Sequence, residues 1–368
     1  MKIAIFHNFM DNIGGAEIVV LSLARGLEAD IYTTSIDEEK IRLMGFADII
    51  PRIKSIGKVP VNAPFRHQLS LWKFRRLNLG RQYDFYIIAG DWAMSGAVNN
   101  KPNMWYVHSP LNELWQYKDY IREELLVPWK RPLYDMFVWF NRKLTLAYAK
   151  HVGIWVCNSK NSQTRIQNFY KKQAAVINPP VDTKKSTYHP HKNYWLAVNR
   201  LFNNKRIDIQ LKAMAKLPQE KLIIVGSFEK GAKQFEAYKA YIESIKPENV
   251  EIMHWVDVAQ LRMLYAECKG FITTARDEDF GLTPIEAMAA GKPVIAPNEG
   301  GYKESVISGV TGILIDDIDE YKLAAAMKEI GGNAESYKDA CIARAKEYDT
   351  EIFVDKIRGV INKRSDVV

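Results

Sequence analysis

The sequence predicts an α/β protein with two doubly wound parallel-sheet domains. Three observations predict this fold class: the length of the chain, the alternation of short apolar runs with helical patterns, and a polar interruption near the middle. The 368 residues exceed one ordinary core and suit two domains of roughly 150 to 200 residues each. Alternating strand and helix patterns are the signature of a parallel sheet covered by helices.

The first half contains apolar runs that are bounded by turn or cap residues, and each run predicts a strand. The expected strands cover residues 2–6, 30–34, 84–89, 104–108, 153–157 and 174–178. Between the first two, residues 16–28 place Ile18, Leu21 and Leu27 on one face of an amphipathic helix. The first domain is therefore expected to span residues 1–185 and to be Rossmann-like.

A polar segment separates this half from a second alternating series. Residues 181–193 read VDTKKSTYHPHKN, contain a proline and have no hydrophobic period. The expected strands that follow cover 194–198, 221–225, 250–253, 270–274 and 293–296, and the expected helices cover 207–216, 235–245, 260–268 and 284–290. The second domain is expected at 190–346. In such open sheets, ligands bind beyond the carboxyl ends of the strands.

Charge and cysteine content restrict the class of protein. The net charge is +8, and residues 1–190 hold all of the basic excess, with 26 Lys and Arg against 16 Asp and Glu. Cys157, Cys268 and Cys341 are widely spaced and form no metal-ligand pattern, which favours a reducing compartment. The sequence has no secretion-signal pattern and no apolar run of about 20 residues that could span a bilayer. A cytoplasmic protein is expected.

The strongest local signal is the segment RDEDFGLTPIEAMAAG at residues 276–291, between a predicted strand and a predicted helix. Glu278 and Glu286 bracket the turn, and Gly281 allows a close approach of the backbone to a ligand. The first amides of the helix carry partial positive charge, so a diphosphate or a sugar can bind there. A structural interpretation of Glu286 is equally open, because Thr283 followed by Glu286 three residues later matches a capping box.

A second polar loop follows the first strand of the second domain. Arg200 and Lys205 lie five residues apart on this loop, so they can bind both phosphates of a nucleotide diphosphate and neutralise a leaving pyrophosphate. Exposed loop charges are the alternative interpretation. The sequence shows no Asp-x-Asp motif at a strand end, so no metal is expected in the site and the two cations would supply the charge that a metal supplies elsewhere.

Two features of the first half are weaker evidence for a ligand site when each is taken alone. Gly14 and Gly15 stand between the first strand and the first helix, where close backbone contact with a phosphate is favourable, although the spacing is not that of a dinucleotide-binding fingerprint. His108 ends a predicted strand in the sequence WYVHSP. A lone histidine there is more often a hydrogen-bonded structural residue than a catalytic one.

These motifs resemble one known family. The spacing Glu-x7-Glu within EDFGLTPIEAMAAGKPVIA, with Gly300, Gly301 and Glu304 after it, is similar to the donor-sugar motif of retaining glycosyltransferase family 4, and the EDFG form is similar to that of its GDP-mannose-type mannosyltransferases. The resemblance implies the GT-B fold, in which two Rossmann-like domains face a cleft. It also implies that a last helix, here within residues 347–368, packs back on the first domain.

The resemblance assigns roles to individual residues. Glu278 is expected to contact the transferred sugar and Glu286 the nucleotide ribose. Arg200 and Lys205 are expected to bind the diphosphate, and the backbone of Phe280, Gly281, Leu282 and Thr283 to lie near the sugar and diphosphate. Gly14 and Gly15 match the GGAE loop of the family, and His108 matches a histidine that holds the donor sugar in its reactive pose. The departing phosphate oxygen, rather than His108, is expected to accept the proton of the acceptor.

Two tracts rich in cations and aromatic residues lie in the first half, at 52–81 and 129–143. The first of them contains eight basic residues and no acidic one. Such tracts suit an anionic bilayer surface, and solvated charge above packed aromatic residues is the alternative. No nucleic-acid recognition motif accompanies the charge, so no nucleic-acid partner is expected.

The resulting hypothesis is a metal-independent, retaining hexosyltransferase without a cofactor. It would transfer a hexose, mannose by resemblance, from GDP-mannose or another nucleotide diphosphate hexose to a glycan or lipid-linked acceptor, in cell-surface polysaccharide or glycolipid synthesis. Location in the cytoplasm, peripheral on the inner face of the membrane, is expected. The alternatives are a sugar-nucleotide epimerase of similar fold and a non-catalytic carbohydrate-binding protein, with a Rossmann oxidoreductase disfavoured by the absence of its glycine fingerprint.

Overall fold

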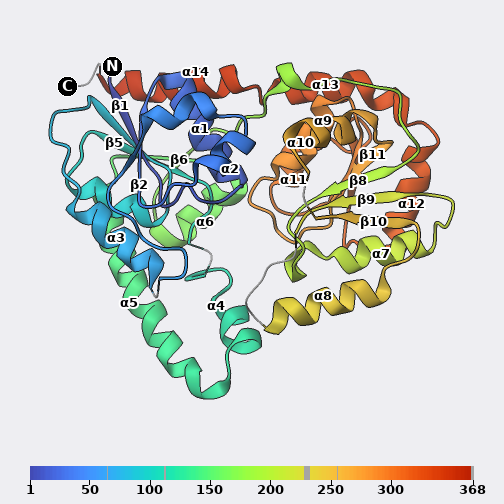
Figure 1. Cartoon of the computed structure of the whole chain (residues 1–368), viewed down its shortest axis with the longest axis horizontal. Coiled ribbons are helices and arrows are strands. Elements are labelled where there is room, and N and C mark those ends of the chain that lie inside the picture. The colour runs from blue at the N-terminus through green and yellow to red at the C-terminus, as the bar shows by residue number, and fades with distance from the viewer. Residues whose placement is uncertain (64, 112, 228–232, 255, 366–368) are drawn as a thin grey trace. The chain divides into compact units, whose positions relative to one another are not determined.

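The computed structural model describes residues 1–63, 65–111, 113–227, 233–254 and 256–365 of the chain (Figure 1). The described residues form two compact units. Unit 1 comprises Met1–Pro179 and Phe353–Val368, and unit 2 comprises Pro180–Ile352. Each unit has a parallel sheet with helices on both faces, so the α/β fold class is confirmed.

The sheet of unit 1 has the strand order β3-β2-β1-β4-β5-β6-β7, and all of its pairings are parallel. Its strands are β1 (Ile3–Phe6), β2 (Asp30–Thr33), β3 (Ile53–Ser55), β4 (Phe85–Ile88), β5 (Asn103–Val107), β6 (Ile154–Cys157) and β7 (Ala175–Val176). The order reverses between β1 and β4, since β2 and β3 extend to one side of β1 and the later strands to the other.

Alternate residues of these strands enter two separate hydrophobic cores. Ile5 of β1 lies in one core with Ile87 of β4, whereas Phe6 lies in the other with Ile88. Because successive side chains of a strand point to opposite faces, both faces of the sheet are buried. The helices that cover them are α1 (Gly15–Leu27), α2 (Glu38–Leu43), α3 (Arg66–Arg76), α4 (Lys118–Tyr120), α5 (Arg131–Ala149) and α6 (Lys160–Tyr170).

The last helix, α14 (Thr350–Ser365), packs on unit 1 although it follows unit 2 in the chain. Phe353, Ile357 and Ile361 are buried in the same core as α1 and β1. The ring of Phe353 lies edge-on to that of Tyr106, with ring centroids 5.6 Å apart. One face of this helix therefore belongs to the core of unit 1.

Unit 2 repeats this architecture with the strand order β10-β9-β8-β11-β12-β13. Its strands are β8 (Trp195–Val198), β9 (Leu222–Val225), β10 (Val250–Met253), β11 (Gly270–Ile272), β12 (Val294–Pro297) and β13 (Gly312–Ile315). The helices are α7 (Ile207–Ala215), α8 (Lys233–Ile245), α9 (Val258–Glu267), α10 (Leu282–Ala289), α11 (Tyr302–Ser305), α12 (Glu320–Gly331) and α13 (Lys338–Lys346). The order reverses between β8 and β11.

Candidate active site

The carboxyl ends of β8 and β11 bring together two loops that the sequence singled out. The loop after β8 carries Arg200 and Lys205, and the loop after β11 carries Glu278. These strands are neighbours in the sheet and mark the point where the strand order reverses. Open α/β sheets bind ligands at such a switch point, beyond the carboxyl ends of the strands.

Lys205 and Glu278 form an ion pair. The Nζ atom of Lys205 lies 2.5 Å from Oε2 of Glu278, and the two side chains are 13% and 27% exposed. The charges are therefore partly withdrawn from water and compensate one another. A ligand with phosphates and hydroxyl groups could exchange partners with both side chains.

Arg200 lies on the same loop and is exposed. Its guanidinium carbon is 5.5 Å from the centre of the Phe202 ring, and the Nζ atom of Lys205 is 5.9 Å from that centre. One aromatic ring is thus near both of the cations that were expected to bind a diphosphate.

Arg206 links this loop to the rest of the site, and sequence reasoning did not identify it. Its backbone is left-handed, with φ of 49°. Its guanidinium donates hydrogen bonds to the carbonyl oxygen of Thr274, at 2.6 Å, and to the carboxylate of Glu299. The hydroxyl of Thr274 in turn donates to the carbonyl oxygen of Lys205, at 2.7 Å. The loops after β8, β11 and β12 are therefore joined by one polar network.

The loop after β11 passes directly into α10, which begins at Leu282 with Gly281 as its N-cap. Gly281 has φ of 85°, and a Cβ atom at this position would lie 2.5 Å from the ring of Tyr302. No side chain caps the helix, so its first amides are not covered by a capping side chain. Phe280 is buried below the loop.

The capping-box interpretation of Thr283 and Glu286 is wrong. Thr283 lies inside the helix, one residue after its first position, so it is not the N-cap. Glu286 instead accepts a hydrogen bond of 2.7 Å from the hydroxyl of Tyr265 on α9. Burial raises the pKa of the Glu286 carboxyl, although Tyr265 and Arg262 act in the opposite direction. A carboxylate withdrawn from water in this way is suited to bind hydroxyl groups.

A glycine pair allows the loop after β12 to approach the loop of Glu278. The amide of Gly301 donates to the carbonyl oxygen of Glu278 at 2.8 Å. A Cβ atom at Gly301 would lie 2.3 Å from Cα of Phe280, so only glycine fits there. Sequence analysis gave Gly300 and Gly301 only as part of the family motif and did not predict this contact.

Asn199 lies directly after β8, and sequence reasoning did not identify it as a candidate site residue. Both polar atoms of its side-chain amide are buried and have no hydrogen-bond partner. A buried amide without partners is costly, by roughly 1–3 kcal/mol. Its position beside Arg200 indicates a polar group that a ligand could satisfy.

Unit 1 has polar residues at the carboxyl ends of its own strands. His108 follows β5, and burial together with the neighbouring His7 lowers the pKa of its imidazole to about 3. The imidazole is therefore neutral near pH 7. Its Nε2 atom is buried without a hydrogen-bond partner, and its backbone carbonyl accepts a hydrogen bond of 2.6 Å from Asn158.

The Gly14–Gly15 loop of unit 1 follows β1, at the reversal of its strand order. Gly14 is the N-cap of α1, and no side chain caps that helix. Glu17 in the first turn lies 3.8 Å from Nε2 of His7, and the His7 ring lies 6.5 Å from that of His108, measured between centroids. The structure thus groups His108 with a second histidine, which the sequence did not single out.

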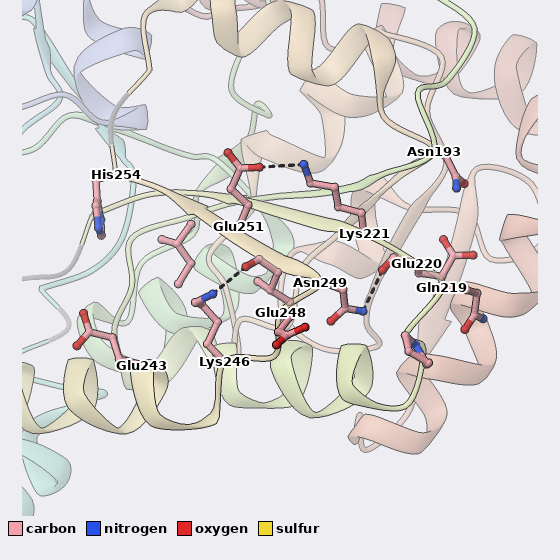
Figure 2. A pocket seen from close by; sticks show the side chains of 13 residues that line it. Asn193, Gln219, Glu220, Lys221, Glu243, Lys246, Glu248, Asn249, Glu251 and His254 are labelled. Atoms are coloured by element: carbon pink, nitrogen blue, oxygen red, sulfur yellow. Dashed lines mark hydrogen bonds and ion pairs between the residues drawn. The ribbon is translucent and has the colours of Figure 1, made fainter.

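A cavity of about 770 Å³ in unit 2 lies away from these loops. It runs along the edge strand β10 and includes residues just before β9 and β10 (Figure 2). Lys221 pairs with Glu251 at 2.9 Å, and Lys246 donates to the carbonyl oxygen of Val250 at 3.1 Å. None of the predicted site residues lines this cavity.

Within the described part of the chain, no group of three or more His, Cys, Asp or Glu side chains could hold a metal ion. Cys157, Cys268 and Cys341 are buried free thiols. No helix among the described residues is long and apolar enough to cross a membrane.

Two doubly wound units, one with cations and carboxylates at its switch point, define a class of α/β proteins that bind phosphorylated ligands. Residues 181–348 match the family model of the glycosyl transferases group 1. The α-1,3/1,6-mannosyltransferase alg-2 of Neurospora crassa is 24% identical over 86% of this chain and 80% of its own length. The O-antigen chain mannosyltransferase RfbU of Salmonella typhimurium is 27% identical over 63% of this chain and 65% of its own length.

Solved structures agree with the fold. Anabaena Alr3699/HepE, in complex with UDP and glucose, superposes with a TM-score of 0.77 at 20% identity, over 98% of this chain and 99% of that one. Sucrose-phosphate synthase from Thermosynechococcus elongatus has the same TM-score at 18% identity and covers both chains completely. The solved structures show that the chain has the GT-B fold, and the sequence matches show that it is similar to glycosyltransferases of the family 4 type.

Proposed function

We propose that this glycosyltransferase transfers a mannosyl residue from a nucleotide diphosphate sugar to a glycan or lipid-linked acceptor, with retention of anomeric configuration and without a metal ion. The observation that carries the proposal is the pairing of Lys205 with Glu278 at the switch point of unit 2. The mannosyltransferase names of the relatives support the choice of sugar.

In this proposal the donor binds at the carboxyl ends of β8 and β11. Arg200 and Lys205 contact the diphosphate, together with the backbone of Phe280, Gly281, Leu282 and Thr283 at the start of α10. Glu286, held by the hydroxyl of Tyr265, accepts hydrogen bonds from the ribose. The UDP and UDP-glucose complexes of Anabaena Alr3699/HepE support a nucleotide-sugar donor.

Donor binding then exchanges the partners of one ion pair. Lys205 moves its hydrogen bonds from Glu278 to the diphosphate, which carries more negative charge. Glu278 is thereby released to accept hydrogen bonds from hydroxyl groups of the sugar. The exchange spares the cost of leaving either charge unpaired in a partly buried position.

The chemistry requires stabilisation of the leaving group and not a protein base. Positive side chains and helix amides stabilise the charge that develops on the departing nucleotide diphosphate. Its phosphate oxygen accepts the proton of the acceptor hydroxyl. His108 is neutral near pH 7, so it can act as a hydrogen-bonding partner and not as a cation.

A lipid-linked acceptor would bring the enzyme to a bilayer. We propose a peripheral location on an anionic inner membrane face, in the synthesis of a cell-surface polysaccharide or glycolipid. The basic excess of residues 1–190 supports this location, because anionic lipids attract clustered Lys and Arg.

The test compares donors on the purified full chain. GDP-mannose and several UDP-hexoses are added in turn, and thermal unfolding and release of the nucleotide diphosphate are measured. GDP-mannose should raise the unfolding temperature and be hydrolysed slowly without acceptor. Release of an epimerised sugar, or no response to any nucleotide sugar, would contradict the proposal.

A pair of matched variants localises the response. Glu278→Gln should abolish most donor hydrolysis while leaving the chain folded, because it removes the charge proposed to hold the sugar. Glu251→Gln is the control, since this half-exposed glutamate lies on β10 away from the site. Equal loss in both variants would mean that the effect is not specific to the site.

A further inference from the structure

Helix α5 presents apolar side chains to solvent over half of its length. Its outward-facing residues include four large apolar side chains, with exposed fractions of 58% at Leu133, 63% at Met136, 62% at Trp139 and 55% at Phe140. Trp129, just before the helix, is 70% exposed. A surface helix of a soluble protein normally places polar residues on this face.

The opposite face of α5 packs on the rest of unit 1. Val138, Asn141, Thr145 and Ala149 are buried and recur at helical spacing. Val138 lies in a core cluster with Leu71 of α3 and Trp92. The exposed apolar residues are therefore not needed for the fold of unit 1, and a patch of this kind marks an interaction surface.

Helix α3 lies beside α5 (Figure 1) and also exposes large apolar side chains. The side chain of Gln68 on α3 donates to Oδ1 of Asn141 on α5 at 3.3 Å. On α3, Leu69 and Trp72 are exposed, as is Phe65 just before the helix. The guanidinium of Arg76 lies over the Trp72 ring, 3.6 Å from its centre.

Most of the charged residues on and just before these two helices are basic. Residues 129–150 contain five Lys and Arg and one acidic residue, Asp135, which pairs with Arg122 at 2.9 Å. Residues 65–77 contain four Lys and Arg and no acidic residue. Lys143 and Lys150 are exposed on α5 beyond the apolar residues. Exposed aromatic residues bordered by cations are the composition of helices that lie in the interface of an anionic bilayer.

We infer that the exposed apolar face of α5, extended by α3, docks on the surface of an anionic lipid bilayer. This inference names the surface for the proposed peripheral location and rests on that location. The apolar side chains enter the boundary between headgroups and acyl chains, and the lysines contact anionic headgroups. The long axis of α5 then lies in the plane of the interface, because its apolar residues extend along the helix.

The test is flotation of the full chain with vesicles. Two compositions are compared: phosphatidylcholine alone, and phosphatidylcholine with about 30% phosphatidylglycerol, an anionic lipid. The wild type should float with the anionic vesicles and remain at the bottom with the neutral ones. Met136→Ser combined with Trp139→Ser should reduce the partition coefficient about tenfold or more, since two large apolar groups no longer enter the interface.

A charge variant and a control complete the test. Lys143→Ser combined with Lys150→Ser should reduce partitioning roughly 30-fold, because each lysine near an anionic surface contributes about a factor of five. Tyr321→Ser is the matched control, because Tyr321 is an equally exposed aromatic residue on α12 of unit 2. It should float like the wild type. All of the replaced side chains are exposed, so the variants should give the circular dichroism spectrum of the wild type.

Three outcomes would overturn the inference. If the wild type fails to float while donor hydrolysis persists, the membrane surface is ruled out and the transfer activity is unaffected. If the α5 variants float like the wild type, the lipid contact lies elsewhere. If sedimentation shows self-association that the Met136 and Trp139 replacements abolish, the face binds a second copy of the chain.

Discussion

Arg206 combines an unfavourable backbone conformation with favourable side-chain contacts. Its replacement by alanine and by glycine measures the two free energies separately. The left-handed backbone of Arg206, with φ of 49°, costs a residue with a Cβ atom roughly 1 kcal/mol. Its guanidinium contacts with Thr274 and Glu299 offset this cost, because hydrogen bonds of charged groups contribute about 1.5–3 kcal/mol each when buried. The side chain is 16% exposed, so solvent weakens these contacts only in part.

We expect Arg206→Ala to destabilise unit 2 by about 2–4 kcal/mol, since the contacts are lost and the backbone cost remains. For a unit of this size, that corresponds to a fall in unfolding temperature of roughly 4–16 °C. Arg206→Gly should be about 1 kcal/mol more stable than Arg206→Ala, because glycine adopts positive φ without a Cβ penalty. Both variants should raise the donor KM, since the network positions Lys205.

Differential scanning calorimetry of the full chain measures the stability, and hydrogen exchange of the α7 and β11 amides localises the change to unit 2. Lys212 on α7, 43% exposed, provides the control pair. Inside a helix, glycine is less stable than alanine by about 0.5–1 kcal/mol, so the order of the two variants should reverse there. The reasoning fails if glycine is the less stable replacement at position 206 as well.

Two further predictions concern single groups in the two units. Tyr265→Phe removes the hydroxyl that donates to Glu286 and should weaken GDP-mannose binding about tenfold; titration calorimetry that shows an unchanged Kd would contradict the role of Glu286. The folded-state pKa of His108 is about 3, below its ordinary value of 6.5. Its stabilising contribution is therefore complete above pH 6.5 and is lost as the pH falls toward 3. Between pH 7.5 and 5, the wild type should lose about 2 kcal/mol more unfolding free energy than His108→Asn, and equal losses in urea titrations would contradict the burial of a neutral imidazole.

Most of the strands could be predicted because they are buried on both faces and form continuous apolar runs. The strand β3 was missed because it reads IKS at the edge of the sheet, where it is partly exposed. It lies within the basic tract at 52–81, so no apolar run marks it. The strand β13 was also missed, because it is short and begins with Gly312, and glycine is depleted in strands.

Individual residues of the candidate site could be singled out from the sequence, but the contacts between them could not. Loops that follow strands in a parallel sheet share one edge, which is why Lys205 and Glu278 could both be singled out. Their ion pair joins residues 73 positions apart, and it depends on β8 lying beside β11, which no local pattern specifies. The same limit applies to Tyr265 with Glu286 and to Arg206 with Glu299, because each pair is formed by tertiary packing.

The capping box shows how a local pattern can mislead. Thr283 and Glu286 have the correct spacing, but Gly281 allows the chain to turn into α10 two residues before Thr283. The helix therefore begins before the proposed cap, and Glu286 becomes available to Tyr265. In this case the glycine, rather than the polar pair, determined where the helix begins.

The most direct measurement is the steady-state transfer rate of Arg200→Gln combined with Lys205→Gln, assayed with and without a chelator. If positive side chains neutralise the leaving diphosphate, the double variant should lose about 1000-fold or more in kcat/KM, and EDTA should leave the wild-type rate unchanged. A double variant within tenfold of wild type, or a wild-type rate that EDTA abolishes and Mg²⁺ or Mn²⁺ restores, would contradict the proposed stabilisation of the leaving group.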